Sequence, residues 1–280
     1  MTNNSLNLSN KLPTPIIETL RQIKIIADEL KIPLLLVGAT ARDLILQHAY
    51  NVSSNRATKD IDFGVAVSSW EEFAKLKSVL SEKGNFLVED KIEHRIKDSV
   101  TKIPIDLIPF GNIEVPRGKI TWKNKNEMIT SGFVEAFESA LNVELAKNLT
   151  IKVVSPVGLA LLKIVAWSDR KSNKDSQDFW LIVKNYLDLG NEDRLYSEML
   201  EFVLKVENFD RIDVSARLLG RDLSKILTEQ TKEIISATFE SEKKLQKLAS
   251  EIYRMEGSFD DFRFDKILTV LESVQKGLRD

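Results

Sequence analysis

The stretch "LLLVGATARDLIL", residues 34–46, runs from an apolar strand through Gly38 into a helix. Glycine permits a sharp turn and a close approach of the backbone because it has no Cβ. A strand that turns directly into a helix presents free backbone N–H groups and the positive end of the helix dipole. Gly38, Ala39 and Thr40 are therefore a candidate phosphate-binding turn, although a purely structural turn has the same pattern.

Two polar side chains of this stretch have candidate roles. The hydroxyl of Thr40 can donate a hydrogen bond to a phosphate oxygen. Arg42 can contact the substrate, or it can form an ion pair with the neighbouring Asp43. The sequence leaves both alternatives for Arg42 open.

Paired acids follow in "KDIDFGV", residues 59–65. Side chains alternate between the two faces of a strand, so Asp60 and Asp62 share one face while Ile61 and Phe63 enter the core. Two carboxylates this close repel each other unless a cation lies between them. Their oxygens are the ligands that Mg²⁺ prefers. The pair is thus a candidate metal site, and the alternative is a strand end with two solvated acids.

A third acid, Asp106, lies in "IPIDLIPFG", residues 103–111, between apolar residues that face the other way. An isolated charge in apolar surroundings is costly, and the neighbouring sequence offers Asp106 no cationic partner. If this strand lies beside residues 60–67, the three acids can bind two metal ions about 4 Å apart. Asp106 could also receive the proton of an attacking hydroxyl. We interpret His94 and Arg95 as a surface hairpin, with a phosphate contact as the alternative.

Strand and helix patterns alternate up to about residue 150. Pro15 opens a helix after a loose tail at residues 1–14, and "SSWEEFAKLKSVLSEKG", residues 68–84, has a serine cap and a terminal glycine. Further strands are expected over 32–38, 61–67 and 86–115, a helix over 41–50, and mixed strand and loop up to about 150. Beyond Ser155 the pattern is helix after helix, so we place a domain boundary near residues 150–157.

A polar stripe marks the first helical segment after this boundary. On one continuous helix, the spacing of four, three and four residues aligns Lys163, Trp167, Arg170 and Lys174, with Asp178 one turn further. Long cations and a tryptophan on a buried helix suggest a cleft wall that binds a triphosphate and stacks a base. The alternative is a salt-bridged surface helix, and "KSN" at 171–173 can interrupt the helix.

The composition excludes several classes of protein. The chain has 280 residues, of which 43% are hydrophobic and 29% charged, as in ordinary globular proteins of one or two domains. A net charge of −2 argues against a broad binding surface for duplex DNA. No cysteine and only two histidines are present, so any metal must be bound by oxygen. Neither a signal peptide nor a membrane span is predicted, and we expect a cytoplasmic protein.

The order of these motifs resembles that of the DNA polymerase β-type nucleotidyltransferase superfamily. Within it, "VGATARDLIL" is similar to the opening of tRNA CCA-adding enzymes, although Ala39 stands where glycine or serine is usual. "GLALLKIVAWSDRKSNKDSQDF" is more similar to the AbiEii/AbiGii-type toxin nucleotidyltransferases. The positions that match their helical motif are Lys163, Ala166, Arg170, Lys174, Asp175 and Asp178.

This resemblance implies both a fold and an activity. The fold is an α/β (α+β) nucleotidyltransferase domain with a mixed sheet, residues 1–154, followed by an all-helical domain, residues 155–280, that closes the NTP cleft. The activity is transfer of a nucleoside monophosphate from an NTP to an acceptor hydroxyl. Mg²⁺ or Mn²⁺ would be the cofactor, and the acceptor a tRNA, a protein or a small molecule. A toxin silenced by an antitoxin partner is one biological role that the resemblance suggests.

The resemblance also implies residue roles. Asp60 and Asp62 would hold the metal on the triphosphate, and Asp106 would bind the second metal and activate the acceptor. The Gly38 turn would hold phosphate. Lys163 and Lys174 would neutralise the charge that builds on the leaving pyrophosphate. The alternative is a nucleotide-binding or interaction module on the same scaffold that has lost catalysis.

Overall fold

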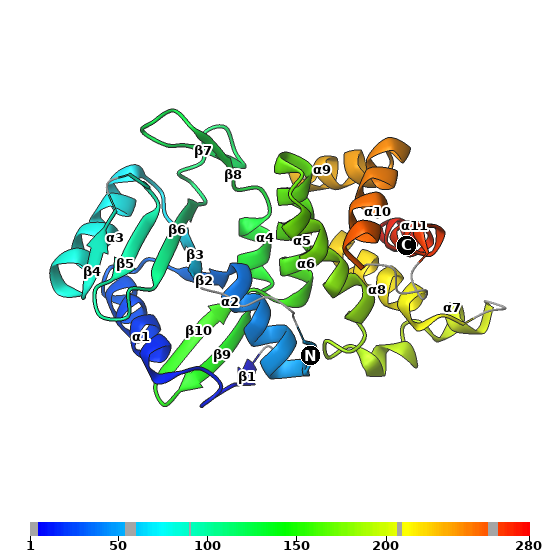
Figure 1. Cartoon of the computed structure of the whole chain (residues 1–280), viewed down its shortest axis with the longest axis horizontal. Coiled ribbons are helices and arrows are strands. Elements are labelled where there is room, and N and C mark those ends of the chain that lie inside the picture. Colours follow the sequence, from blue (N-terminus) through cyan, green and yellow to red (C-terminus); the bar gives the residue numbers. More distant parts are fainter. Residues whose placement is uncertain (1–4, 54–59, 90, 206–208, 257–262) are drawn as a thin grey trace. The chain divides into compact units, whose positions relative to one another are not determined.

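A computed structural model of the chain describes residues 5–53, 60–89, 91–205, 209–256 and 263–280. The chain divides into two compact units, Met1–Ser155 and Pro156–Asp280 (Figure 1). No helix among the described residues is both long and apolar enough to cross a membrane.

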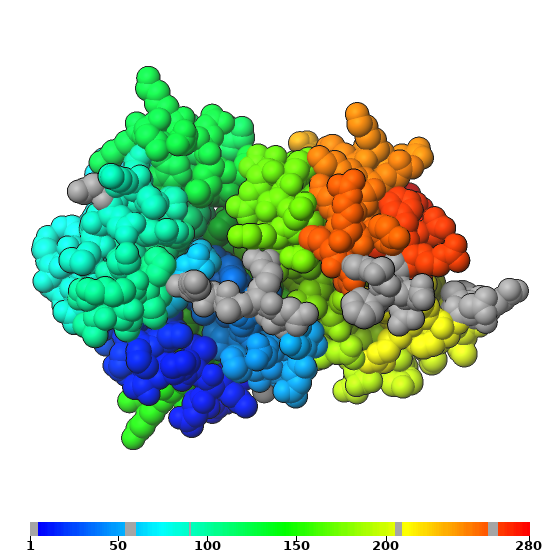
Figure 2. All heavy atoms as spheres, viewed as in Figure 1, coloured from blue at the N-terminus to red at the C-terminus, as the bar shows by residue number. Residues whose placement is uncertain are grey.

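The first unit is built on a mixed sheet of eight strands in the order β1-β9-β10-β2-β3-β6-β5-β4. In its middle, β2 and β3 are antiparallel while β3 and β6 are parallel. A separate hairpin, β7–β8, projects from the rest of the unit (Figures 1 and 2). The strands are β1 (Ser5–Asn7), β2 (Leu34–Val37), β3 (Ile61–Ala66), β4 (Phe86–Val88), β5 (Arg95–Asp98), β6 (Pro104–Phe110), β7 (Lys119–Thr121), β8 (Glu127–Ile129), β9 (Leu141–Ala146) and β10 (Leu149–Val153).

Helices connect these strands and cover the sheet. They are α1 (Thr14–Glu29), α2 (Gly38–Arg42), a π-helix (Asp43–Ala49), α3 (Trp70–Lys83) and α4 (Phe133–Glu138). The helix α3 begins as predicted, because the Ser69 side chain accepts a hydrogen bond from the backbone N–H of Glu72. Leu35, Phe63 and Leu107 on three neighbouring strands have no exposed surface. Burial of these side chains holds the central strands in place. The positions of the residues at the ends of these strands are thereby determined as well.

Two expectations for this unit were wrong. Residues 5–7 are not part of a loose tail, because they form β1 and pair in parallel with β9. The adjacent Leu8 is buried, which anchors this edge strand to the core. Residues 133–138 form α4 in a stretch where only strand and loop were expected.

In the part of the second unit that the structure describes, all regular elements are helices, as the sequence predicts. Its elements are α5 (Pro156–Arg170), α6 (Asn173–Asn185), a 3-10 helix (Glu192–Leu195), α7 (Leu200–Lys205), α8 (Arg211–Ile226), α9 (Glu229–Phe239), α10 (Glu242–Glu256) and α11 (Phe264–Arg279). The helices α8 and α11 pack very closely where Gly220 meets Gly277. A Cβ on Gly220 would lie 2.2 Å from the carbonyl oxygen of Val274.

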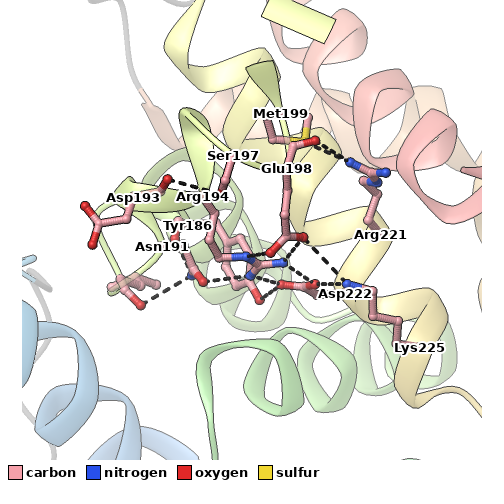
Figure 3. A network of polar contacts seen from close by, with 11 residues as sticks. Tyr186, Asn191, Asp193, Arg194, Ser197, Glu198, Met199, Arg221, Asp222 and Lys225 are labelled. Atoms are coloured by element: carbon pink, nitrogen blue, oxygen red, sulfur yellow. Dashed lines mark hydrogen bonds and ion pairs between the residues drawn. The ribbon is translucent and has the colours of Figure 1, made fainter. Parts of the chain in front are cut away.

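A partly buried polar network joins the 3-10 helix to α8 (Figure 3). The hydroxyl of Tyr186 donates to Asp222 over 2.7 Å, and the guanidinium of Arg194 donates to both oxygens of the same carboxylate. Arg194 also donates to Glu198. Burial alone would raise the pKa of Asp222, but the hydrogen bonds from Arg194 and Tyr186 outweigh it and lower the pKa below its usual value. The ionised form of Asp222 therefore stabilises this unit.

Tyr186→Phe is expected to lower the free energy of unfolding of the second unit at pH 7 by about 1.5–3 kcal/mol, the usual range for a hydrogen bond to a charged group. The pKa of Asp222 is lower in the folded protein than its ordinary value of 3.8. The carboxylate therefore stabilises the fold at pH values above 3.8, and this stabilisation is lost as the pH falls through the lower pKa of the folded protein. The difference between variant and wild type should therefore narrow in acid. Urea denaturation at several pH values measures it.

Tyr253→Phe is the matched control, because this tyrosine is 46% exposed. It should change the unfolding free energy by less than about 0.5 kcal/mol at any pH. Equal effects of the two substitutions would contradict the role given to Tyr186.

Candidate active site

Strand register brings three acids together at one end of the sheet. Asp62 on β3 lies directly opposite Asp106 on β6, and Val37 at the end of β2 lies opposite Asp62 on its other side. Asp60 immediately precedes β3. One carboxylate oxygen of each acid lies within 4.8 Å of the others. We call Asp60, Asp62 and Asp106 the acidic triad.

Gly38 is required by the acidic triad as well as by the turn. Its φ of +69° is in the left-handed region. A Cβ at this position would lie 2.0 Å from Oδ2 of Asp62 and 2.6 Å from its Cγ, which is far inside van der Waals contact. The glycine therefore makes room for the Asp62 carboxylate beside the start of α2.

Thr40 supports the triad through the backbone. Its hydroxyl donates a 2.8 Å hydrogen bond to the carbonyl oxygen of Asp60, and its side chain is buried. The expectation that this hydroxyl donates to a phosphate is wrong for this conformation, since its one proton is already used. Gly38 and Ala39 begin α2 directly after β2, so backbone N–H groups are the phosphate donors that this turn can offer.

Arg42 takes the second of its two alternatives. The guanidinium donates to Oδ1 of Asp43 from Nε over 2.9 Å and from Nη2 over 2.7 Å. Only 1% of the surface of Arg42 is exposed, so its side chain is buried beneath the turn. In this conformation Arg42 therefore forms the ion pair, and a contact between Arg42 and the substrate stays a prediction.

Asp106 has a cationic partner that the neighbouring sequence did not reveal. Arg95 lies opposite it on the antiparallel strand β5. Its Nε donates to Oδ1 over 2.6 Å and its Nη2 donates to Oδ2 over 2.8 Å. These hydrogen bonds raise the pKa of Arg95. The expectation that Asp106 lacks a cation is wrong, because the partner comes from the next strand of the sheet, eleven residues earlier in the chain.

His94 lies at the margin of the same site. Its Nε2 is 3.8 Å from Oδ2 of Asp106. Burial lowers the pKa of His94, against the opposing attraction of Asp106. Its ring packs against Trp122 of the β7–β8 hairpin, with 5.5 Å between centroids. The segment 94–95 is thus built into the site rather than forming a free surface hairpin.

A pocket of about 630 Å³ opens beside Asp60 within the first unit. Thr40, Asp43, Lys97 and Lys102 are among the residues that line it. Apolar surface comes from Ile16 of α1, from Pro104 at the start of β6 and from the neighbouring Ile103. The pocket therefore offers both cations and apolar surface next to the acidic triad.

The predicted polar stripe of the second unit is interrupted. The helix α5 ends at Arg170, Lys171 has a φ of +53°, and α6 begins at Asn173 after a cap by Ser172. Lys174 therefore lies on a different helix from Lys163, with its side chain exposed. The continuous helix assumed for the stripe was wrong, because the "KSN" segment turns the chain.

Packing of α6 on α5 produces a charged cluster instead. Nζ of Lys163 lies 2.7 Å from Oδ2 of Asp178 and 3.7 Å from Oδ1 of Asp175. Arg170 donates to both oxygens of Asp175, over 2.6 and 2.8 Å. Both carboxylates are almost completely buried. Lys163 is thus a cation held in one position by two buried acids.

Trp167 belongs to the core of the second unit. It has no exposed surface, and its Nε1 donates to Glu251 of α10 over 2.6 Å. Nζ of Lys171 lies over its ring, 4.5 Å from the centroid. The expectation that Trp167 stacks a base is therefore wrong for this conformation.

Comparison with known families decides the identity of the chain. Residues 20–269 match the family described as nucleotidyl transferase AbiEii toxin, type IV toxin–antitoxin system. The protein belongs to the AbiEii family. The predicted family, the predicted fold class and the predicted nucleotidyltransferase activity are thereby confirmed. No curated protein matches the chain.

Several solved structures resemble this AbiEii protein at low sequence identity. The antibiotic-resistance factor ANT(2'')-Ia is 14% identical over 68% of this chain and 97% of its own, with a TM-score of 0.40. A nucleotidyltransferase-like protein from Paracoccidioides brasiliensis is 15% identical over 68% of this chain and 90% of its own, with a TM-score of 0.40. The Thermotoga maritima CCA-adding enzyme is 12% identical over 97% of this chain and 82% of its own, with a TM-score of 0.27.

Gly38→Ala is expected to disturb the acidic triad of this AbiEii protein. The positive φ alone should cost about 1–2 kcal/mol of stability. In addition, the new Cβ must displace the Asp62 carboxylate, so the Mn²⁺ binding that the sequence predicts for the triad should weaken by about tenfold or more, equivalent to about 1.4 kcal/mol. Urea denaturation and titration with Mn²⁺, followed by electron paramagnetic resonance, measure the two effects.

Gly111→Ala is the matched control. Gly111 also has a positive φ, of +99°, but the nearest atom to its Cβ would be 3.5 Å away. It should show the loss of stability without the loss of Mn²⁺ binding. If both variants bound Mn²⁺ as the wild type does, Gly38 would be needed by the turn alone.

Proposed function

We propose that this protein transfers a nucleoside monophosphate from an NTP to an acceptor hydroxyl at a divalent metal site formed by the acidic triad. The observation that carries the proposal is the approach of three carboxylate oxygens to within 4.8 Å of one another at the ends of two neighbouring strands. Family membership supports the transfer reaction.

The residues present fit a hard divalent cation. All three candidate ligands are carboxylates, which suit Mg²⁺ or Mn²⁺. Their charges repel one another, and the Arg95 guanidinium pairs with the carboxylate of Asp106. Gly38 has no Cβ, and the carboxylate of Asp62 occupies the space that a Cβ at Gly38 would need. When bound, the cation would neutralise charge on the triphosphate and on the reacting oxygens.

The side chains of the first unit would perform distinct tasks. Asp60 and Asp62 would bind the triphosphate through the cation, and backbone N–H groups at Gly38 and Ala39 would bind its phosphate oxygens. Asp106 would take the proton of the acceptor hydroxyl. The acceptor oxygen then forms a bond to the α-phosphorus as the bond to pyrophosphate breaks. The pocket beside Asp60 would bind part of a substrate.

Lys163 of the second unit is the proposed cation for the triphosphate, together with Lys174. Its ammonium group is fixed by Asp175 and Asp178, yet the side chain keeps 14% of its surface exposed. A cation held in position before binding loses little entropy when a phosphate arrives. It would stabilise the charge that builds on the leaving pyrophosphate.

The acceptor would be a hydroxyl of a tRNA, a protein or a small molecule. The family description places its members in type IV toxin–antitoxin systems, so we further propose a toxin with a cognate antitoxin. The alternative, a module that has lost catalysis, is disfavoured because all three acids are present and converge.

Incubation with each α-labelled NTP, Mg²⁺ and a cell extract tests this function. We expect label in one class of acceptor: tRNA, protein or metabolite. Asp62→Asn should lower labelling by about 10²-fold or more while leaving the fold intact. Glu82→Gln, which changes an exposed acid of the same unit, should have no effect. NTP binding without any label would instead support the silent module.

Lys163→Met tests the cation of the second unit. It leaves Asp178 buried without this partner, so stability should fall by about 3–5 kcal/mol and labelling should fall as well. The double variant Lys163→Met with Asp178→Asn also removes the negative charge of the buried carboxylate and should recover stability but not labelling. If the double variant recovered both, the cluster would only join α5 to α6.

A further inference from the structure

We propose that the pocket beside Asp60 binds the acceptor, and that the acceptor is a phosphate ester whose phosphate group is bound by Lys97 and Lys102. The inference rests on the proposed function, because it assigns a chemical class to the second substrate of the same site.

The sheet register places Lys97 on the same face as the acidic triad. On β5, Arg95 lies opposite Asp106, and its guanidinium donates to that carboxylate. Lys97 follows two residues later and lies opposite Pro104, so its side chain leaves the same face of the sheet. Residues two apart on a strand are separated by about 7 Å. A group bound by Lys97 is therefore close to a hydroxyl whose proton Asp106 takes.

Lys102 is the second lysine of the pocket lining. It lies in the turn between β5 and β6, with a φ of +61°. The carboxylate of Asp98 accepts hydrogen bonds from the backbone N–H groups of Val100 and Thr101, over 2.8 and 2.9 Å, and so fixes this turn. Nζ of Lys102 donates to the carbonyl oxygen of Ser99. The ammonium group is therefore held within the turn that borders the pocket.

The ion pairs of the pocket favour an anionic ligand at the lysines. Lys97 lies 3.4 Å from the carboxylate of Glu89, and the two side chains are 38% and 32% exposed. A pair this exposed stabilises the fold only weakly, whereas a phosphate accepts strong charge-assisted hydrogen bonds. The carboxylate of Asp43 is paired with Arg42, and Asp60 is a proposed ligand of the metal cation. The two lysines therefore suit a phosphate better than these surface contacts do.

The π-helix brings hydrogen-bonding side chains to the same pocket. Residues five apart lie on one face of a π-helix, because its hydrogen bonds join residues five apart. Asp43 and His48 have this spacing, and both line the pocket together with Gln47. In an α-helix, which turns about 100° per residue, Asp43 and His48 would lie about 140° apart. The unusual helix therefore presents an amide and an imidazole to the ligand.

The size and the apolar lining of the pocket complete the match. Its volume of about 630 Å³ lies within the range of about 300–1,000 Å³ that is usual for small-molecule sites. Ile16 and Pro104 supply apolar surface for a ring, and Gln47 and His48 can bind hydroxyl groups or ring nitrogens. A sugar phosphate and the terminal nucleotide of an RNA share this chemistry. The hydroxyl of an unmodified protein side chain has no phosphate for the lysines.

Calorimetric titration of the full-length protein tests the class of ligand. The NTP site is first filled with a non-hydrolysable NTP analogue and Mg²⁺. The probes are glucose 6-phosphate, compared with glucose, and the RNA trinucleotide UpUpU, compared with uridine. At least one phosphate-bearing probe should bind about tenfold or more tightly than its counterpart, and the tighter of the two probes distinguishes a metabolite from RNA. Equal binding within both pairs would overturn the proposal.

Lys97→Met and Lys102→Met test the two cations. Each should weaken binding of the phosphate-bearing probe by about tenfold while leaving the affinity for the NTP analogue unchanged. Lys75→Met is the matched control, because it removes an exposed lysine of α3 that is not among the described residues lining the pocket. It should bind probe and analogue as the wild type does. If the pocket variants weakened only the analogue, the pocket would belong to the NTP, and the proposal would be overturned.

Labelling of a cell extract separates this failure from a failure of the proposed function. The double variant Lys97→Met with Lys102→Met should raise KM for the acceptor by about tenfold or more and leave KM for the NTP unchanged. If the wild type labelled an acceptor, Asp62→Asn did not, and the double variant matched the wild type, the function would stand and the acceptor pocket would fall. If the wild type labelled nothing, the function itself would be wrong.

Discussion

Mutual repulsion within the acidic triad is the constraint on which the first unit depends. Carboxylates held within 4.8 Å of one another destabilise the fold unless the chain or a cation compensates. The sheet register fixes two of them, Gly38 leaves space for one, and Thr40 fixes the backbone of Asp60. Arg95 compensates one charge. Binding of a divalent ion between these carboxylates would relieve their repulsion.

Local patterns were enough to predict the elements that bear this site. Alternation in "DIDF" places Asp60 and Asp62 on one face, and apolar runs identify β2, β3 and β6. These local patterns could not predict which strands are neighbours in the sheet. The pairing of Arg95 with Asp106 depends on the β5–β6 register, and no sequence spacing indicates a contact between two strands before both are placed in a sheet.

The second unit shows the same limit for helices. Spacing predicted a stripe on one helix, but a turn at Lys171 divides it, and packing of α6 on α5 brings Asp178 to Lys163 from across the helix pair. Trp167 fits the helical spacing equally well as a core residue, and Glu251, from more than eighty residues away, satisfies its indole N–H. The hydrogen bond to Glu251 shows that Trp167 is a core residue and not a ligand-binding residue. Because the two residues are so far apart in sequence, only the folded structure reveals this contact.

The central claim is that the acidic triad binds the divalent ion that positions the triphosphate. Anomalous diffraction at the manganese edge, from crystals grown with Mn²⁺ and a non-hydrolysable NTP analogue, tests it most directly. The account predicts an anomalous peak between the carboxylates of Asp60 and Asp62, with phosphate oxygens of the analogue as further ligands. An ordered nucleotide whose phosphates lie elsewhere, with no manganese at these two carboxylates, would contradict it.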